Sequence, residues 1–170
     1  KLGISYMVFD GVELINYNIN SIRKQVDFIS VIYQTTSYFG NKSNSNQFDI
    51  LKNTKADKII HVEPDLNVHH KINELNYRNL GLSLSREAGC THHISFDVDE
   101  FCMPKQLEYA KQTFGDNDCS IIRNDYYYKK PEYLIVPDQE LIVTFIHPVD
   151  NEYFVSQDPK FKKIETTRRH

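Results

Sequence analysis

The sequence has no apolar run close to the roughly 18 residues that cross a lipid bilayer, so we expect no transmembrane segment. It also has no internal repeat and no low-complexity stretch. Hydrophobic residues make up 40% of the chain and charged residues 25%, which excludes an extended disordered chain or a collagen-like fibre. At 170 residues, the chain is long enough for one domain to bury a core without disulfides or a structural metal.

Cysteine is scarce, and the three cysteines form none of the C-x-x-C spacings typical of zinc or redox sites. They are Cys90, Cys102 and Cys119. We therefore expect a reducing, cytoplasmic compartment. No signal-peptide pattern opens the chain, which starts at Lys1 and not at a methionine. This start indicates a domain trimmed from a longer protein.

Acidic residues outnumber basic ones outside the last eleven positions. The formal net charge is -3, and residues 160–170 carry +4, which leaves -7 for the first 159 residues. Nucleic-acid binding needs a basic face that displaces counterions from phosphates, so we expect no nucleic-acid partner. The basic end has several interpretations: a solvated tail, the start of a further segment, a lid over a diphosphate, or a peripheral contact with a membrane surface.

Apolar residues recur with the periods of strands and helices that alternate through the first hundred residues. The predicted strands are 2–9, 28–33, 58–62 and 93–99, and the predicted helices are 12–26, 48–56 and 68–88. This alternation predicts an α/β fold with a mostly parallel central sheet flanked by helices. Ligands of such sheets bind at the carboxyl ends of the strands.

Two of the predicted helices have a regular apolar spacing. The first places four residues on one face, namely Ile15, Ile19, Ile22 and Val26. The third has helical spacing at Val68, Ile72, Leu75, Asn79 and Leu82. Gly89 follows this helix and suits the left-handed residue at a helix end.

The second part of the chain has a different pattern. It contains one predicted helix and three strand-like runs, at 104–114, 120–128, 133–136 and 141–146. We predict a single domain over 1–170, in which residues 1–103 hold one ligand. Residues 104–170 then form a short mixed β half that shapes the other side of the cleft.

Two aspartates end the last apolar strand of the first half, in the run Asp97-Val98-Asp99-Glu100. Residues i and i+2 of a strand point to the same side, so we expect Asp97 and Asp99 to converge. Glu100 would then lie on the opposite face, where we expect it to orient the turn. Neighbouring carboxylates repel and are costly to desolvate, and a divalent cation relieves both costs. Carboxylate oxygens favour Mg²⁺ or Mn²⁺. The alternative is a solvated turn without a ligand.

This strand end follows a helix that contains Tyr77-Arg78-Asn79-Leu80-Gly81 and ends at Ala88-Gly89. Together with the strands Ile4-Ser5-Tyr6-Met7-Val8 and Val26-Asp27-Phe28-Ile29-Ser30-Val31, it resembles the nucleotide-sugar-binding half of GT-A glycosyltransferases, particularly family-2-like members. The resemblance covers residues 2 to about 103. It implies a single GT-A, Rossmann-like domain and a metal-dependent hexosyltransferase-like activity. The sugar would pass from a nucleoside-diphosphate sugar, a UDP- or GDP-sugar, to a hydroxyl acceptor such as a glycan or polysaccharide.

The resemblance implies roles for single residues. Asp97 and Asp99 would hold Mn²⁺ or Mg²⁺, Asp99 directly and Asp97 through a metal-bound water or the ribose. His147 is a candidate for a further metal ligand, with a hydrogen-bonded structural histidine as the alternative. Asp10 and Gln34 end the first two strands, where the family reads the base and the ribose; for Asp10 the alternative is initiation of its turn.

Two further roles concern the donor phosphates and the acceptor. Arg78 would either contact the diphosphate or hold Asp97 by a bidentate contact, and the alternative is a surface ion pair. If the reaction inverts the anomeric centre, a carboxylate must take the acceptor proton, and our candidates are Asp138 and Glu140. A retaining enzyme needs no such base.

Two other functions compete with this hypothesis. A non-catalytic module that binds a nucleotide or a carbohydrate would use the same carboxylates without turnover. A D-x-D phosphatase or phosphotransferase of the haloacid dehalogenase type needs its aspartates after the first strand, whereas Asp97 and Asp99 come after three earlier predicted strands. The sequence therefore favours glycosyl transfer over phosphoryl transfer.

Overall fold

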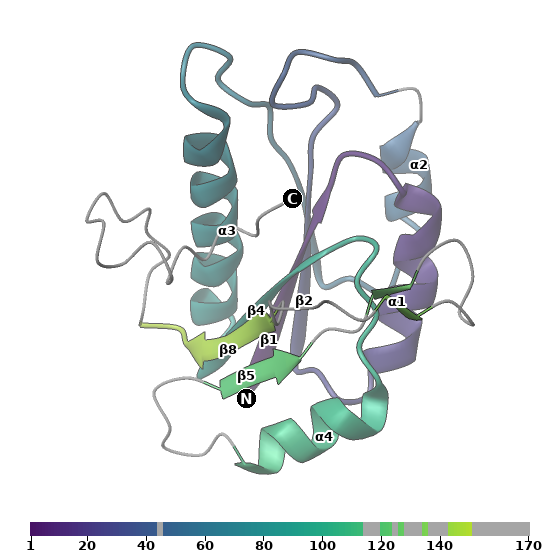
Figure 1. Cartoon of the computed structure of the whole chain (residues 1–170), viewed down its shortest axis with the longest axis vertical. Coiled ribbons are helices and arrows are strands. Elements are labelled where there is room, and N and C mark those ends of the chain that lie inside the picture. The colour runs from purple at the N-terminus through teal and green to yellow at the C-terminus, as the bar shows by residue number, and fades with distance from the viewer. Residues whose placement is uncertain (44–45, 114–119, 124–125, 128–133, 136–142, 151–170) are drawn as a thin grey trace.

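The structure is a computed structural model that describes residues 1–43, 46–113, 120–123, 126–127, 134–135 and 143–150 (Figure 1). The strands are β1 (Leu2–Val8), β2 (Phe28–Tyr33), β3 (Lys58–His61), β4 (His92–Asp97), β5 (Ser120–Arg123), β6 (Tyr126–Tyr127), β7 (Leu134–Ile135) and β8 (Val143–Pro148). The helices are η1 (Val12–Leu14, a 3-10 turn), α1 (Ile15–Ile22), α2 (Gln47–Leu51), α3 (His70–Glu87) and α4 (Pro104–Thr113).

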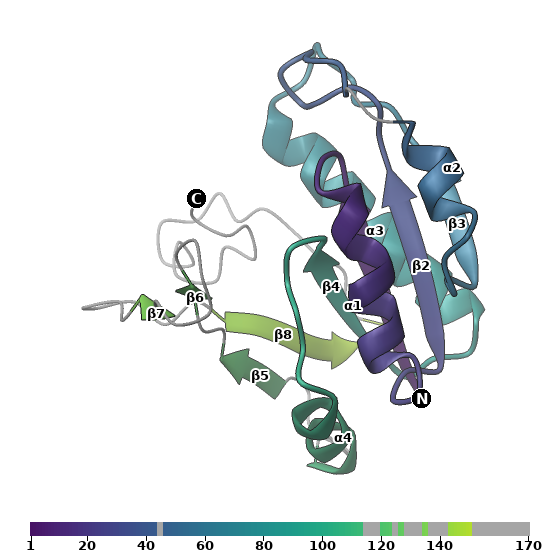
Figure 2. The same cartoon turned by 90° about the vertical axis from the view of Figure 1, so that its right-hand side faces the viewer.

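Six of the described strands form one sheet in the order β3-β2-β1-β4-β8-β5. Strands β3, β2, β1 and β4 are parallel, while β8 runs antiparallel to β4 and to β5. Figure 2 shows β8 and β5 extending from β4 on the side away from β2. The predicted α/β class with a mostly parallel sheet flanked by helices is confirmed.

The two faces of the sheet are covered by different helices, α3 on one face and α1 and α2 on the other (Figure 1). Alternate residues of β1 point to alternate faces. Leu2, Ile4, Tyr6 and Val8 lie in the main apolar core with the buried residues of α1. The predicted buried face of α1 is confirmed for Ile15, Ile19 and Ile22, which are fully buried there. Val26, the fourth predicted residue, is also buried, but it follows the end of the helix.

The inner face of α3 differs from the spacing that the sequence suggested. Val68 precedes the helix, and Ile72 is 41% exposed, although Leu82 is buried as expected. The buried positions carry several small or polar residues, among them Asn73, Arg78, Gly81 and Ser85. The helix ends as predicted, with Gly89 at a φ of 74°.

Each of two glycines lies opposite a serine in the contact between α3 and β1. A Cβ atom at Gly81 of α3 would lie 2.5 Å from Cβ of Ser5, and a Cβ at Gly3 of β1 would lie 2.6 Å from Cβ of Ser85. Such distances are far shorter than van der Waals contact. The two glycines therefore allow the helix to approach the strand closely.

His93 of β4 lies inside this contact and is fully buried. Its Nδ1 is 2.8 Å from Oγ of Ser85, and its Nε2 is 3.3 Å from Oγ of Ser5. Burial lowers the pKa of His93 well below its usual value, and the nearby His147 and Arg78 lower it further. Burial also lowers the pKa of His147.

We expect the free energy of unfolding to fall as the pH is lowered below about 6.5, the pKa of an unfolded histidine. In this range the unfolded chain binds a proton at His93, whereas the folded chain does not. Each pH unit of acidification therefore lowers the free energy of unfolding by up to about 1.4 kcal/mol for each such histidine. Urea unfolding between pH 7.5 and 5.5 measures this slope. His93→Gln should flatten it and His70→Gln should not; an equal slope in all three proteins would contradict the prediction.

No helix among the described residues is both long enough and apolar enough to span a membrane.

Candidate functional site

The four parallel strands end at one edge of the sheet. In the register, Val8 pairs with Tyr33, Tyr33 with His61, and Met7 with Asp97. The residues that follow these strands therefore lie along a common carboxyl edge, where α/β sheets bind ligands.

The carboxylate of Asp97 is held by a buried arginine of α3. Nη2 of Arg78 lies 3.3 Å from Oδ1 of Asp97, and Nη1 donates to Oγ of Ser95 at 2.9 Å. Nε of Arg78 donates to Oε1 of Glu74 at 3.0 Å. The arginine side chain is only 7% exposed. Of the roles expected for Arg78, the geometry favours holding Asp97.

The acidic run forms a turn and not the extended strand end that we expected. Strand β4 stops at Asp97, Val98 and Asp99 are turn residues, and the backbone N–H of Glu100 donates to the carbonyl of Asp97 at 3.1 Å. The i, i+2 argument for convergence of Asp97 and Asp99 is therefore wrong. The side chain of Glu100 accepts from the N–H of Asp97 at 2.8 Å, which confirms that it orients the turn.

Asn18 of α1 contacts the same turn from inside the core, and the sequence reasoning missed it. Its Nδ2 donates to the carbonyls of Val98 at 2.9 Å and Glu100 at 2.7 Å, and its side chain is fully buried. The available signal was one polar residue on the otherwise apolar face of the first helix.

Asp10 and Gln34 follow β1 and β2 at this edge, as expected. Asp10 is exposed, whereas Gln34 is buried and its backbone N–H donates to the carbonyl of Val8 at 3.0 Å. The Nε2 of Gln47 donates to the carbonyl of Phe9 and, at 3.0 Å, to Oγ of Ser43. These bonds join the loop after β2 to the end of β1.

A second carboxylate, Glu63, fixes the loop after β2 to the end of β3. It accepts from the N–H of Thr35 at 3.1 Å, from the Thr35 hydroxyl, and from Nε2 of His61 at 2.8 Å. Partial burial raises the pKa of Glu63, but these hydrogen bonds and one from Thr36 outweigh burial and lower the pKa to about 2. The ring of His61 stacks on Tyr33 with centroids 4.8 Å apart.

Two tyrosines near Arg78 were also missed. The rings of Tyr38 and Tyr77 lie with centroids 5.9 Å apart. Burial raises the pKa of Tyr38, and the nearby Glu74 raises it further; burial raises the pKa of Tyr77 to about 12. Both hydroxyls therefore stay protonated at neutral pH. Nothing in the local sequence distinguishes these tyrosines from others in the chain.

His147 lies away from the two aspartates, which corrects its expected role as a ligand of the same metal. It pairs with His93 in the antiparallel ladder between β8 and β4, and Asp97 is four residues further along β4, which corresponds to about 13 Å. Its side chain is buried, and its Nδ1 lies 3.0 Å from the carbonyl of Pro148. The geometry fits the structural alternative.

The candidate bases Asp138 and Glu140 lie outside the described residues. Within the described part of the chain, no three His, Cys, Asp or Glu side chains are grouped so that they could hold a metal ion. Asp97 and Asp99 thus offer two carboxylates at the turn, with the Asp97 side chain 24% exposed and Asp99 exposed.

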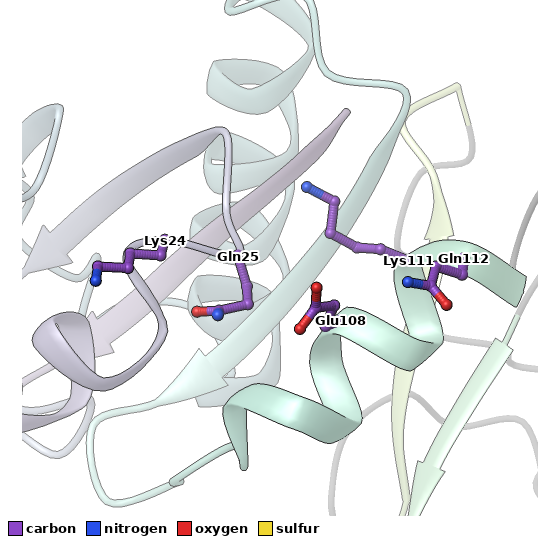
Figure 3. Close-up of a pocket in the computed structure, with 5 residues that line it drawn as sticks. All are labelled: Lys24, Gln25, Glu108, Lys111 and Gln112. Atoms are coloured by element: carbon purple, nitrogen blue, oxygen red, sulfur yellow. The ribbon is translucent and has the colours of Figure 1, made fainter.

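A pocket of about 360 Å³ lies elsewhere, near the amino ends of β1 and β2 (Figure 3). Its lining residues are Lys24 and Gln25 from the segment after α1, and Glu108, Lys111 and Gln112 of α4. None of the predicted site residues that the structure describes lines this pocket, and it lies at the sheet edge opposite to Asp97.

No known protein family matches the sequence, and no curated protein is significantly similar to it. One solved structure that aligns with the chain is a crystal structure of S. aureus TarS 1-349, with 14% identity and a TM-score of 0.42. The alignment covers 71% of this chain and 34% of that one, so the chain spans about a third of its length. The function is therefore inferred from the chain's own residues.

Proposed function

We propose that this protein is a metal-dependent glycosyltransferase that takes a sugar from a nucleoside-diphosphate sugar and passes it to a hydroxyl acceptor. The supporting observation is the turn of Asp97 and Asp99 at the carboxyl edge of a parallel sheet, anchored by Arg78 and Asn18. Acidic residues are common in turns, but two buried side chains that fix one such turn indicate that its position matters.

The residues at the turn suit an open site for a hard divalent cation. They do not form a site in which protein ligands alone surround the metal. Mg²⁺ and Mn²⁺ keep several waters and bind through one or two carboxylates together with substrate phosphates. Two partly accessible carboxylates, without a third described ligand, meet this requirement. When bound, such a cation would stabilise the negative charge that develops on the departing diphosphate.

The chain's own residues have separate tasks in this proposal. Arg78 holds Asp97 in place, while Gln34 and Asp10 contact the base or the ribose of a UDP- or GDP-sugar. For inversion of the anomeric centre, Asp138 or Glu140 would accept the acceptor proton. The resemblance of the sequence to GT-A enzymes supports this assignment of the donor site.

We expect UDP or GDP to raise the melting temperature by about 5 °C or more, in the presence of Mn²⁺ only. A ligand that binds the folded state alone, at 100 times its Kd, adds about 2.7 kcal/mol, and each kcal/mol shifts Tm by about 2–4 °C at this chain length. A thermal-shift assay with and without Mn²⁺ measures the effect. Asp99→Asn should remove it.

The matched control is Glu87→Gln, which changes an exposed acid at the far end of α3 and should leave the shift intact. The proposal is overturned if neither nucleotide shifts Tm with Mn²⁺, or if Asp99→Asn keeps the full shift. Slow release of nucleoside diphosphate from the sugar donor separates an enzyme from a binding module, which would show the shift without release.

A further inference from the structure

Asn18 uses both hydrogens of its amide on the backbone around Asp99. One goes to the carbonyl of Val98 at 2.9 Å and the other to the carbonyl of Glu100 at 2.7 Å. These carbonyls belong to the residues before and after Asp99. The backbone of Asp99 is thus fixed on both sides, although its own side chain is exposed.

The orientation of the Asn18 amide is set by Tyr6 of β1. The Tyr6 hydroxyl donates to Oδ1 of Asn18 at 3.4 Å. Burial raises the pKa of Tyr6 strongly, and the nearby Cys102 and Glu100 raise it further, so this hydroxyl is a donor at any physiological pH. The amide oxygen therefore faces Tyr6, and the amide nitrogen faces the turn.

We propose that Asn18 is a positioning residue of the donor site, which holds Asp99 where a divalent cation and a diphosphate would meet it. This inference rests on the proposed function. Arg78 and Asn18 divide the task between them: Arg78 restrains the side chain of Asp97 from the α3 face of the sheet, and Asn18 restrains the backbone of Asp99 from the α1 face. An aspartate could not replace Asn18, since its carboxylate would repel two carbonyls.

Asn18→Ala tests the proposal. The matched control is Asn20→Ala, which changes an exposed asparagine of the same helix. Binding of Mn²⁺ in the presence of UDP or GDP is followed by the electron paramagnetic resonance of the free ion, at a temperature where every variant is folded. We expect Asn18→Ala to weaken binding about tenfold, as for other residues that orient metal ligands. Asn20→Ala should bind as the unmodified protein does.

A second measurement depends only on the turn. The N–H of Glu100 bonds to the carbonyl of Asp97, and we expect its hydrogen exchange to become at least about tenfold faster in Asn18→Ala. Exchange at Ile94, within β4, should not change. Should Asn18→Ala fail to fold, Tyr6→Phe keeps the buried ring, removes the hydroxyl that orients the amide, and should shift both readouts in the same direction.

The outcomes separate the two hypotheses. Unchanged Mn²⁺ binding and unchanged exchange at Glu100 in folded Asn18→Ala would overturn the positioning role. If the unmodified protein binds no Mn²⁺ with either nucleotide, the proposed function fails, and exchange at Glu100 alone then decides whether Asn18 holds the turn.

Discussion

Replacing Arg78 with methionine is expected to lower the free energy of unfolding by about 3 kcal/mol. The arginine side chain is 7% exposed and bonds to Glu74, Ser95 and Asp97. Methionine fills a similar volume but leaves two carboxylates, which are 19% and 24% exposed, without their shared positive charge. Removing one partner of a largely buried ion pair costs far more than the pair gains in net stability.

Urea unfolding at neutral pH measures this loss, and Arg23→Met is the control. Arg23 pairs with Asp57 at 3.0 Å, which lies between the two Arg78 distances of 2.9 Å to Glu74 and 3.3 Å to Asp97, but the side chains of Arg23 and Asp57 are 27% and 36% exposed. An exposed pair contributes at most about 1 kcal/mol. Burial and not distance should therefore decide the ranking, and equal losses in the two variants would contradict the prediction.

The four parallel strands and their alternation with helices along the chain were predictable because local patterns determine them. Buried strands such as Phe28–Tyr33 are continuous apolar runs, and α1 has apolar residues at helical spacing. The inner face of α3 could not be found in this way. Arg78 is buried because it neutralises two carboxylates, and Gly81 is buried because it allows close contact with β1. A search for apolar residues at helical spacing detects neither of them.

The candidate site was found in part. Asp97 was predictable because it ends an apolar strand, whereas Asn18 contacts residues 80 and 82 positions away in the sequence, and Glu63 contacts Thr35, 28 positions away. His147 was misplaced for a topological reason. It stands near the end of an apolar run, but β8 is antiparallel to β4, so that run ends near the amino end of β4. The direction of an added strand cannot be read from one sequence.

The contact between α3 and β1 links the stability of the fold to the geometry of the site. Arg78 and Gly81 lie three residues apart and are both buried on the inner face of α3. If the helix moves away from β1, the guanidinium moves away from Asp97. A substitution at Gly81 should therefore affect both the packing of the helix and the restraint on that carboxylate.

Gly81→Ala is expected to lower the free energy of unfolding by about 2 kcal/mol, which corresponds to a fall in Tm of about 4–8 °C. The new Cβ would lie 2.4 Å from Oγ and 2.5 Å from Cβ of Ser5, so the helix must shift. Overpacking of this kind costs about 1–3 kcal/mol, and the severe overlap places it at the upper end. The better helix propensity of alanine offsets at most about 1 kcal/mol.

Two further variants show whether the loss comes from this one contact. Ser83→Ala, at a half-buried position of the same helix, should change the free energy of unfolding by less than about 0.5 kcal/mol. Ser5→Gly removes the atoms that the new methyl group would strike, so the double variant Ser5→Gly/Gly81→Ala should be more stable than the sum of the single losses by about 1 kcal/mol or more. Strictly additive losses would mean that Gly81 is required for some reason other than its distance from Ser5.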